Sequence, residues 1–485
     1  MLAIPICFFA LFAVFAFMDP QGVYNYIENW SLWVRDWFGN FYLVLGFFSV
    51  LFLLCIAISP LGKVKLGTPK DTPEHSRWSW IAMLYSAGMG AGILLRAVQE
   101  PVFMFVNPPL QTGTPNNTLA LEYTFYQWGL TAWAFYGLFA LIIGYYLFSE
   151  QKKGLISASV AGSVHNQWVL NTIDILVIIT TVFGLVGAID LGTTQINGGL
   201  NHLSDYQFTI NHTIGITVII CLLASFSAWK GINKGIKNIS KVNILITFLL
   251  LLFVLLNSNF ISVLKLFFNA LYHYIVDFIP LSLALGNYNP GKAFLTDWTY
   301  YYWAFWLAWA PFTGVFIARI SKGRTIREML LGVMVIPSLG TFLWFSSFGD
   351  HAFRIIENWG SYNNEFGNVF TSVFVFFSEF PYHFFINMVV VLLLAGFLLT
   401  SIDSAIFVLS MFTDKGKTTP KKAHRLLWGI IVTVFCIAML MLGNARPDID
   451  MLIALQKILI ITSLPFAIFI PIMCFLFLRE LIKNR

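Results

Sequence analysis

Apolar runs long enough to cross a bilayer recur along the whole chain, with short polar segments between them. The pattern predicts a single all-α integral membrane domain of 12 transmembrane helices, which we place at residues 1–18, 41–59, 78–99, 122–148, 171–196, 211–229, 241–259, 298–319, 328–348, 384–410, 425–443 and 452–479. Two further apolar stretches, 266–284 and 368–381, are expected to be interfacial or external helices. Counting either one alone as a span would disrupt the alternation of charge described next.

Basic residues alternate from one loop to the next. Of the 29 lysines and arginines, 22 fall in the even-numbered loops and after the last span, and five fall in the odd-numbered loops. Cytoplasmic loops collect Lys and Arg, so the pattern predicts a protein of the inner (cytoplasmic) membrane with both termini in the cytoplasm. The net charge of +6 is explained by this topology and does not indicate a nucleic-acid partner.

Composition agrees with the predicted spans and argues against several classes of membrane enzyme. The chain is 58% hydrophobic and 11% charged, and a soluble domain could not hide that much apolar surface. The five cysteines all lie in apolar runs without a CxxC pair, and the eight histidines lie in loops or at span ends. These positions argue against a haem, copper or zinc enzyme of the membrane, and we expect no organic cofactor.

Two of the predicted spans contain helix-weakening residues at matching places. Residues 86–92 read SAGMGAG, with glycines at Gly88, Gly90 and Gly92. This glycine pattern favours either close helix packing or an unwound segment whose carbonyls bind a cation. Span 8 contains Pro311 and Gly314, which also predict an interruption. Spans 3 and 8 would begin two five-helix repeats, and broken helices at matching positions indicate a transport site at the bilayer midplane.

Large aromatic residues gather on the faces of spans 4 and 8. Residues 298–312 read WTYYYWAFWLAWAPF, and span 4 reads YTFYQWGLTAWAFYGL. Spacings of three and four place Tyr302, Phe305, Trp306 and Trp309 on one helix face. The ordinary explanation is core filling or an interfacial belt. Indole-rich faces beside a broken helix also suit a cation without hydrogen-bond donors, such as a trimethylammonium group.

Residues 298–328, WTYYYWAFWLAWAPFTGVFIARISKGRTIRE, resemble the signature segment of the betaine/carnitine/choline transporter family. The resemblance extends through SAGMGAG, through QEP at 99–101 and through LTSIDS at 399–404. It implies a LeuT-type fold with two leading helices (1–77), a first repeat (78–259), an interfacial helix region (260–297) and an inverted second repeat (298–479). It also implies a homotrimer in contact with membrane lipids, and transport of quaternary ammonium solutes, glycine betaine above all.

Carried onto this sequence, the resemblance assigns an aromatic substrate box. Its members would be Trp128, Trp133, Tyr136, Trp306 and Trp309, with Phe305 standing where betaine transporters usually have tryptophan. The three glycines of span 3 would line the same site. Choline-specific relatives can carry aspartate at the position of Gly92, so glycine there favours a zwitterion such as glycine betaine or carnitine.

The resemblance also assigns a sodium site. Its oxygens would come from the backbone of Ser86, Met89 and Phe397 and from the hydroxyls of Thr400 and Ser401. Without the resemblance, each hydroxyl is expected to bond a carbonyl one turn earlier. A second sodium site of the family uses two hydroxyls in span 5. This chain has Thr181 but Leu185 there, which predicts one sodium ion per substrate.

Two charges fall at membrane depth and need a partner or water, since each costs about 2.5–3.5 kcal/mol to insert. We expect Arg96 to pair with Asp190 in neighbouring spans. Arg96 could instead bond Glu100 one turn on, or a substrate carboxylate, and Asp190 could carry a proton.

The sequence therefore predicts a secondary active transporter that imports glycine betaine by sodium symport. The alternative within this class is a carnitine or choline transporter that works by exchange or proton symport. An enzyme acting on lipid head groups would need a cluster of catalytic His, Cys or carboxylate groups near the interface, and the sequence shows no convincing one.

Overall fold

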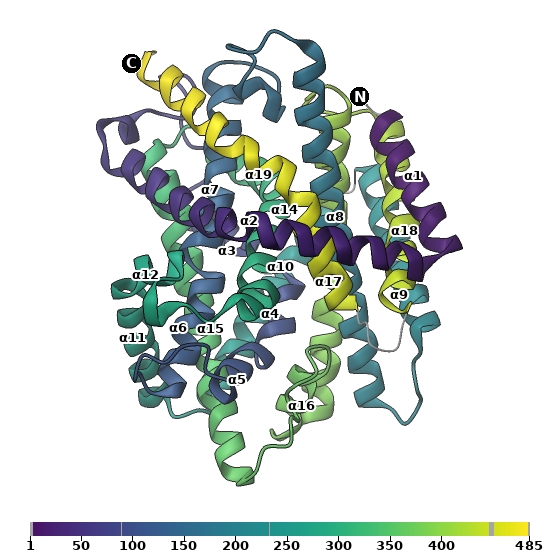
Figure 1. The fold of residues 1–485 in the computed structure, drawn as a ribbon. Helices are drawn as coiled ribbons and strands as arrows, with labels where there is room; N and C mark the ends of the chain where they lie inside the picture. Colours follow the sequence, from purple (N-terminus) through teal and green to yellow (C-terminus); the bar gives the residue numbers. More distant parts are fainter. Residues whose placement is uncertain (1–2, 89, 232, 446–450, 484–485) are drawn as a thin grey trace.

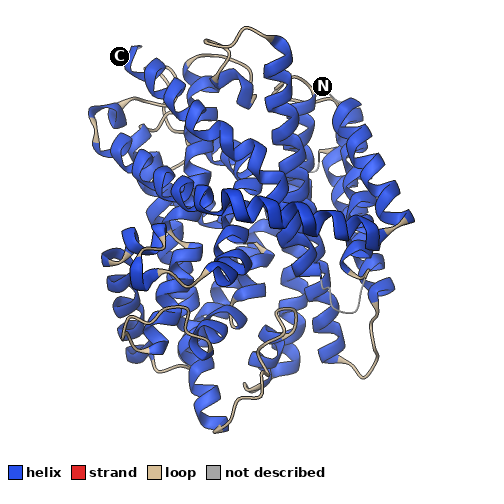
Figure 2. Ribbon diagram, viewed as in Figure 1, coloured by secondary structure: helices blue, strands red, loops and turns tan. Residues whose placement is uncertain are grey.

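The computed structural model describes residues 3–88, 90–231, 233–445 and 451–483, and these ranges are almost entirely helical. They contain no strand, only one isolated bridge between Lys65 and Thr325 (Figure 2). The first half holds α1 (Ala3–Met18), α2 (Pro20–Ile58), α3 (Arg77–Gly88), α4 (Ala91–Arg96), α5 (Gln99–Val106), α6 (Asn116–Trp128), α7 (Leu130–Gly144), α8 (Gln167–Leu203), α9 (Ile210–Lys230) and α10 (Asn233–Leu256).

The second half begins with two helices that pack outside the long ones. These are α11 (Phe260–Val276) and α12 (Phe278–Leu283), followed by α13 (Lys292–Phe294) and a π-helical turn over Leu295–Tyr300. The remaining helices are α14 (Tyr301–Ile320), α15 (Ile326–Trp359), α16 (Ser372–Ser378), α17 (His383–Thr413), α18 (Lys422–Gly443) and α19 (Met451–Lys483). Figure 1 places the start of α1 and the end of α19 at one end of the molecule, while α5, α11 and α16 lie toward the other.

Ten helical segments in the described ranges are long and apolar enough to cross a membrane, and each matches one of the twelve predicted spans. The two exceptions are residues 1–18 and 78–99. Helix α1 has only 16 residues, or about 24 Å, against a hydrocarbon core of about 30 Å. The polar stretch 19–40 was expected to be a loop, but α2 begins at Pro20 and continues as one helix of 39 residues.

Span 3 is interrupted as predicted. Helix α3 ends at Gly88 and α4 begins at Ala91, with Gly90 in an extended conformation (φ −123°, ψ −171°). Span 4 is also interrupted, which the sequence did not lead us to expect. Gly129 separates α6 from α7 with φ −98° and ψ −133°, and a Cβ atom there would lie 2.5 Å from the Phe125 carbonyl oxygen. The backbone amide of Leu130, just past this break, donates to the Tyr274 hydroxyl on α11 at 3.0 Å.

The predicted interruption at Pro311 is wrong. Helix α14 is continuous across this proline. A single proline removes one backbone hydrogen bond, and close packing against neighbouring helices can hold such a helix together. Gly314 contributes to that packing, because a Cβ atom there would lie 2.5 Å from Cβ of Phe139 on α7.

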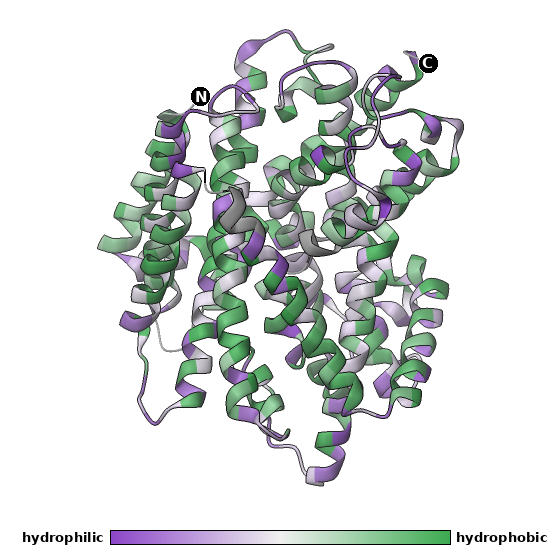
Figure 3. Ribbon diagram, turned by 180° about the vertical axis from the view of Figure 1, so that it is seen from behind, coloured by the Kyte–Doolittle hydropathy of each residue, from purple (hydrophilic) through white to green (hydrophobic). Residues whose placement is uncertain are grey.

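The outer surface of the long helices is apolar. Helices α9 and α10 expose large side chains such as Ile219, Leu223 and Phe248, each more than half accessible. Figure 3 shows green, hydrophobic residues along the helix shafts and purple, hydrophilic residues mainly toward the two ends of the molecule. This distribution is that of a helical bundle surrounded by lipid.

Candidate functional site

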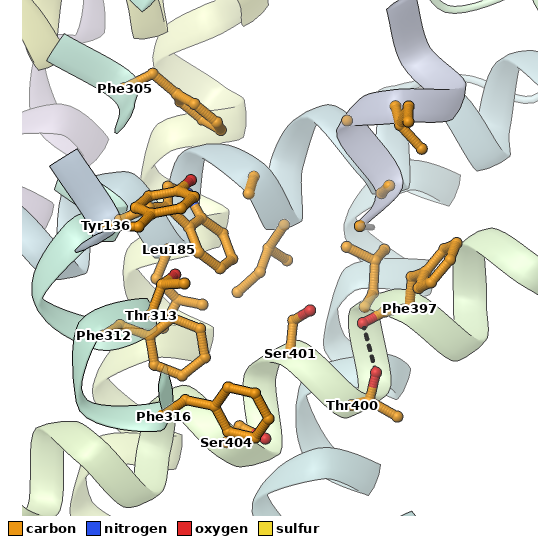
Figure 4. A pocket seen from close by; sticks show the side chains of 18 of the residues that line it. Tyr136, Leu185, Phe305, Phe312, Thr313, Phe316, Phe397, Thr400, Ser401 and Ser404 are labelled. Carbon is orange, nitrogen blue, oxygen red and sulfur yellow. Dashed lines mark hydrogen bonds between the residues drawn. The ribbon is translucent and has the colours of Figure 1, made fainter. Parts of the chain in front are cut away.

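A cavity of about 190 Å³ lies among the interrupted helices (Figure 4). Its lining comes from the start of α4, from the end of α6, from α7, α8 and α10, and from the facing sides of α14 and α17. Five of the six predicted aromatic residues line it: Trp128, Tyr136, Phe305, Trp306 and Trp309. The sequence pattern therefore identified most of one wall.

The aromatic wall is a connected set of rings. Trp128 of α6 and Trp306 of α14 have ring centroids 5.1 Å apart, and Tyr136 of α7 lies 6.0 Å from Trp306, both edge to face. Trp133 is the sixth predicted residue and does not line the cavity. It packs edge to face on Tyr136 at 5.4 Å, so its position is that of a support for the lining ring.

The indole N–H groups of this wall are already bonded to the protein. Trp128 donates to Oε2 of Glu100 at 3.1 Å, and Trp306 donates to the Gln127 carbonyl at 3.0 Å. Trp309 donates to the Gly184 carbonyl at 3.1 Å. The tryptophans therefore have no N–H left to offer a ligand, and their rings present π faces and C–H edges.

Two of the predicted glycines also line the cavity. A Cβ atom added to Gly90 would meet nothing within 4 Å, and one added to Gly92 would meet only the Trp128 ring at 3.6 Å. Space therefore lies open beside the interruption between α3 and α4. Gly88 is the last residue of α3.

Part of the predicted sodium site reaches the same cavity, since Phe397, Thr400 and Ser401 all line it. The Thr400 hydroxyl donates to the carbonyls of Gly396 and Phe397 at 3.1 Å each, the bonding expected of a hydroxyl in an ordinary helix. Figure 4 shows the Ser401 side chain pointing into the space between α17 and α14. Met89, and the side chain of Ser86, lie outside the described part of the chain.

At the second sodium position, Leu185 lines the cavity and presents only apolar atoms to it. The Thr181 hydroxyl is buried without a hydrogen-bond partner among the described residues. The single hydroxyl that remains in this pair is therefore away from the cavity lining.

The predicted pairing of Arg96 with Asp190 is wrong. Asp190 is fully buried on α8, and its interacting neighbours among the described residues are the thiols of Cys221 and Cys436, not Arg96. Arg96 is directed toward Trp298, just before α14, and Tyr302, at the start of that helix. Its guanidinium donates to Oε1 of Gln99 at 2.6 Å and lies 4.9 Å from the centre of the Trp298 ring.

Glu100 connects the interrupted helices to the aromatic wall. Its carboxylate is fully buried and accepts hydrogen bonds from the Trp128 indole and the Tyr302 hydroxyl. Arg96 is near enough to interact with this negative charge, which agrees with Glu100 as the alternative partner considered for Arg96. The QEP segment therefore positions Trp128 and Tyr302 at the edge of the cavity.

A row of four stacked rings leads away from the cavity, starting at Trp306. Phe294, Trp298, Tyr302 and Trp306 follow one another at four-residue intervals, with centroids 6.0, 6.4 and 5.8 Å apart and planes within 25°. The sequence analysis missed this row, although the four-residue spacing was visible. In the other direction the cavity lining continues along α14 from Phe305 to Phe316, about 16 Å, and along α17 to Ser404.

Comparison with known proteins shows which transporters this chain is similar to. The family model for betaine/carnitine/choline family transporters matches residues 1–485. The glycine betaine transporter OpuD of Bacillus subtilis is 37% identical, with 96% of this chain and 91% of the relative aligned. An ectoine/hydroxyectoine transporter of Virgibacillus pantothenticus is 33% identical over 92% and 89% of the two chains. A glycine betaine/proline/choline/ectoine transporter of Vibrio parahaemolyticus is 33% identical over 91% and 79%.

Proposed function

Because the chain belongs to the betaine/carnitine/choline transporter family, whose members are transporters and not enzymes, we propose that it imports glycine betaine by sodium symport. The observation that carries the proposal is the aromatic wall. Trp128, Trp306 and Trp309 face one cavity with their N–H groups bonded elsewhere. A trimethylammonium group offers no hydrogen-bond donor or acceptor, so a surface of π faces is its natural counterpart.

A zwitterion fits this cavity better than a simple cation. Its carboxylate needs space away from the rings, and the open volume beside Gly90 and Gly92 supplies it. No carboxylate side chain lines the cavity in the described part of the chain, so a choline cation would find no counter-charge there. Ectoine, the substrate named for one relative, is a second candidate because it also combines a delocalised cation with a carboxylate.

Sodium is proposed as the coupling ion on the oxygens of α17. Phe397, Thr400 and Ser401 line the cavity opposite α14, and the Phe397 carbonyl accepts a hydrogen bond from the Thr400 hydroxyl. Hard oxygen ligands of this type suit a small cation, and backbone carbonyls at the interrupted end of α3 would complete the set. Leucine at position 185 cannot ligate a cation, so we expect one sodium ion per substrate. Carnitine or choline carried by exchange or proton symport is the alternative.

The proposed mechanism is alternating access in a LeuT-type fold of 12 transmembrane helices. Spans 3–7 and 8–12 would form the inverted repeats, with both termini cytoplasmic and three chains assembled in the membrane. The row of stacked rings would be the closed external gate. The lining that continues toward Phe316 and Ser404 would then be the cytoplasmic path, as in an inward-facing state.

Uptake of labelled glycine betaine into proteoliposomes tests the proposal. An inward sodium gradient is compared with an inward proton gradient at the same membrane potential, with ectoine, carnitine and choline as competitors. Sodium-dependent uptake that glycine betaine inhibits best is the expected result. Uptake driven by protons alone would overturn the sodium assignment, and preference for choline would overturn the substrate assignment.

A further inference from the structure

Three ionisable side chains converge where α11 packs on α6, away from the cavity. They are Glu122 of α6, His273 of α11 and, four residues later, Asp277, which caps the C-terminal end of α11. One potential ligand atom from each lies within 4.8 Å of the other two. Nδ1 of His273 and Oδ2 of Asp277 are 3.5 Å apart. Glu122 is thus brought next to two residues that lie more than 150 positions later in the sequence.

Two of the three side chains in this cluster are acidic and lie against each other. Glu122 is 1% exposed, and its Oε1 atom has no hydrogen-bond partner among the described residues. Oδ1 of Asp277 accepts a hydrogen bond from the Tyr288 hydroxyl at 2.7 Å, which leaves Oδ2 directed toward the histidine. A protonated histidine would compensate only one of the two carboxylates. Two carboxylates held together in a mostly buried place repel each other, so a divalent cation would complete the site better.

We propose that Glu122, His273 and Asp277 bind a divalent transition metal ion, zinc above all. Zinc binds imidazole nitrogen and carboxylate oxygen at about 2.0–2.2 Å, so two tetrahedral ligand atoms lie about 3.4 Å apart. The spacing between His273 and Asp277 already has this value. Two carboxylates, a neutral imidazole and Zn²⁺ sum to zero charge. Three protein ligands leave the fourth position to water.

The site can be reached and is supported. The His273 side chain is 34% exposed, so an ion can enter from the surface without unfolding the helix pair. The Tyr288 hydroxyl fixes the orientation of the Asp277 carboxylate, the usual role of a group that bonds a metal ligand from outside.

Metal binding would affect the transport cavity through one hydrogen bond between α11 and the start of α7. Tyr274, next to His273, accepts the hydrogen bond from Leu130 at the break between α6 and α7. The last residue of α6 is Trp128, which lines the cavity. A zinc ion would tie α11 to α6 on the approach to that break. We therefore expect zinc to slow the movement of the Trp128 wall and so to inhibit uptake, a consequence that rests on the proposed function.

Zinc binding itself is measured on the purified full-length protein in detergent, without any solute. Isothermal titration with ZnCl₂ and the visible spectrum of bound Co²⁺ should show one tetrahedral site per chain. Glu122→Gln and His273→Gln should abolish it, and Tyr288→Phe should weaken it by about 10–100-fold. His202→Gln is the matched control, because that histidine bonds Ser378 elsewhere on the surface. Thermal melting checks that each variant is folded.

Different results would overturn the metal site and the proposed transport activity. Absence of zinc binding by the wild-type protein, or binding that Glu122→Gln and His273→Gln leave unchanged, would overturn the metal site whatever the solute. In proteoliposomes, external zinc should lower the uptake rate of the wild type and of His202→Gln but not of His273→Gln. Zinc binding without any glycine betaine uptake would leave the metal site standing and overturn the proposed transport activity.

Discussion

Replacing Trp306 by leucine tests whether the aromatic wall recognises positive charge or only shape. Trp306 is the ring that joins the set, since Trp128, Tyr136, Tyr302 and Phe305 all lie within 6.0 Å of it, centroid to centroid. Leucine keeps an apolar surface and removes the π face. The substitution therefore separates cation–π attraction from hydrophobic contact.

The expected loss follows from the burial of the site. Trp306 is 7% exposed and the other wall residues are buried or half-buried, so an ammonium group there is largely desolvated. A desolvated cation–π contact is worth about 2 kcal/mol, which corresponds to about 30-fold in affinity. Trp306→Phe retains a weaker π face and should fall between leucine and the wild type. Both variants lose the hydrogen bond to the Gln127 carbonyl, so that loss is common to them.

The assay compares glycine betaine with 3,3-dimethylbutyrate, in which carbon replaces the charged nitrogen and the shape and carboxylate remain. KM for labelled glycine betaine and the inhibition constant of this carbon analogue, which keeps only the negative carboxylate, are measured in proteoliposomes. The wild type should prefer glycine betaine for its positive ammonium group, and Trp306→Leu should lose about 30-fold of that preference. Trp303→Phe is the control, because Trp303 is fully buried one turn earlier and does not line the cavity.

An equal loss of affinity for both compounds would refute the reasoning. It would mean that Trp306 acts through packing, or through the backbone it bonds at the end of α6. A loss confined to the carbon analogue would refute it more strongly, because that result requires Trp306 to recognise the shape of the trimethyl group and not its positive charge.

Three further predictions concern the ion site and the framework. Thr400→Ala should raise the sodium concentration needed for half-maximal uptake, whereas Ser410→Ala, which removes a hydroxyl bonded to a helix carbonyl at 2.7 Å, should not. Gly184→Ala should lower the melting temperature, because its Cβ would lie 2.7 Å from Cβ of Ala308 and overpacking costs about 1–3 kcal/mol. Arg324→Ala should destabilise far more than Arg77→Ala by the same melting assay. Both arginines bond Glu328, but their side chains are 2% and 81% exposed, and exposed pairs contribute about 0–1 kcal/mol. An equal sodium dependence of Thr400→Ala and Ser410→Ala, or an equal melting temperature of Arg324→Ala and Arg77→Ala, would contradict the respective assignment. An unchanged melting temperature of Gly184→Ala would contradict the close packing at that glycine.

Ten of the twelve spans predicted from apolar runs coincide with helices long and apolar enough to cross a membrane, because long hydrophobic helices are determined locally. The glycines of span 3 predicted the interruption at Gly90 for the same reason, since glycine weakens a helix wherever it occurs. Local sequence failed at Pro311, where the outcome depends on packing by neighbouring helices. It also missed the break at Gly129, which is enforced by contact with Phe342 of a distant helix, whose ring would lie 2.6 Å from an added Cβ.

Side-chain pairing was the least predictable part of the site. Arg96 and Asp190 are both charged and lie in neighbouring spans, yet they face different partners because helix rotation decides which way each points. The cluster of Glu122, His273 and Asp277 has the same origin. The four-residue spacing of His273 and Asp277 is visible in the sequence, but nothing there shows that Glu122 meets them. Such contacts follow from tertiary packing rather than from local pattern.

The two observed breaks differ in how they are held, and this difference suggests which part of the cavity moves. At Gly129 the amide beyond the break is bonded to α11, and an added Cβ would collide with backbone and ring, so the position of the α6–α7 junction depends on α11 and on this close packing. At Gly90 an added Cβ meets open space. Glu100 joins the segment beyond that break to Trp128 and Tyr302. Movement of α4 and α5 would therefore disturb Trp128 and Tyr302, and a restraint on α11 would act on the same wall through the α6–α7 junction.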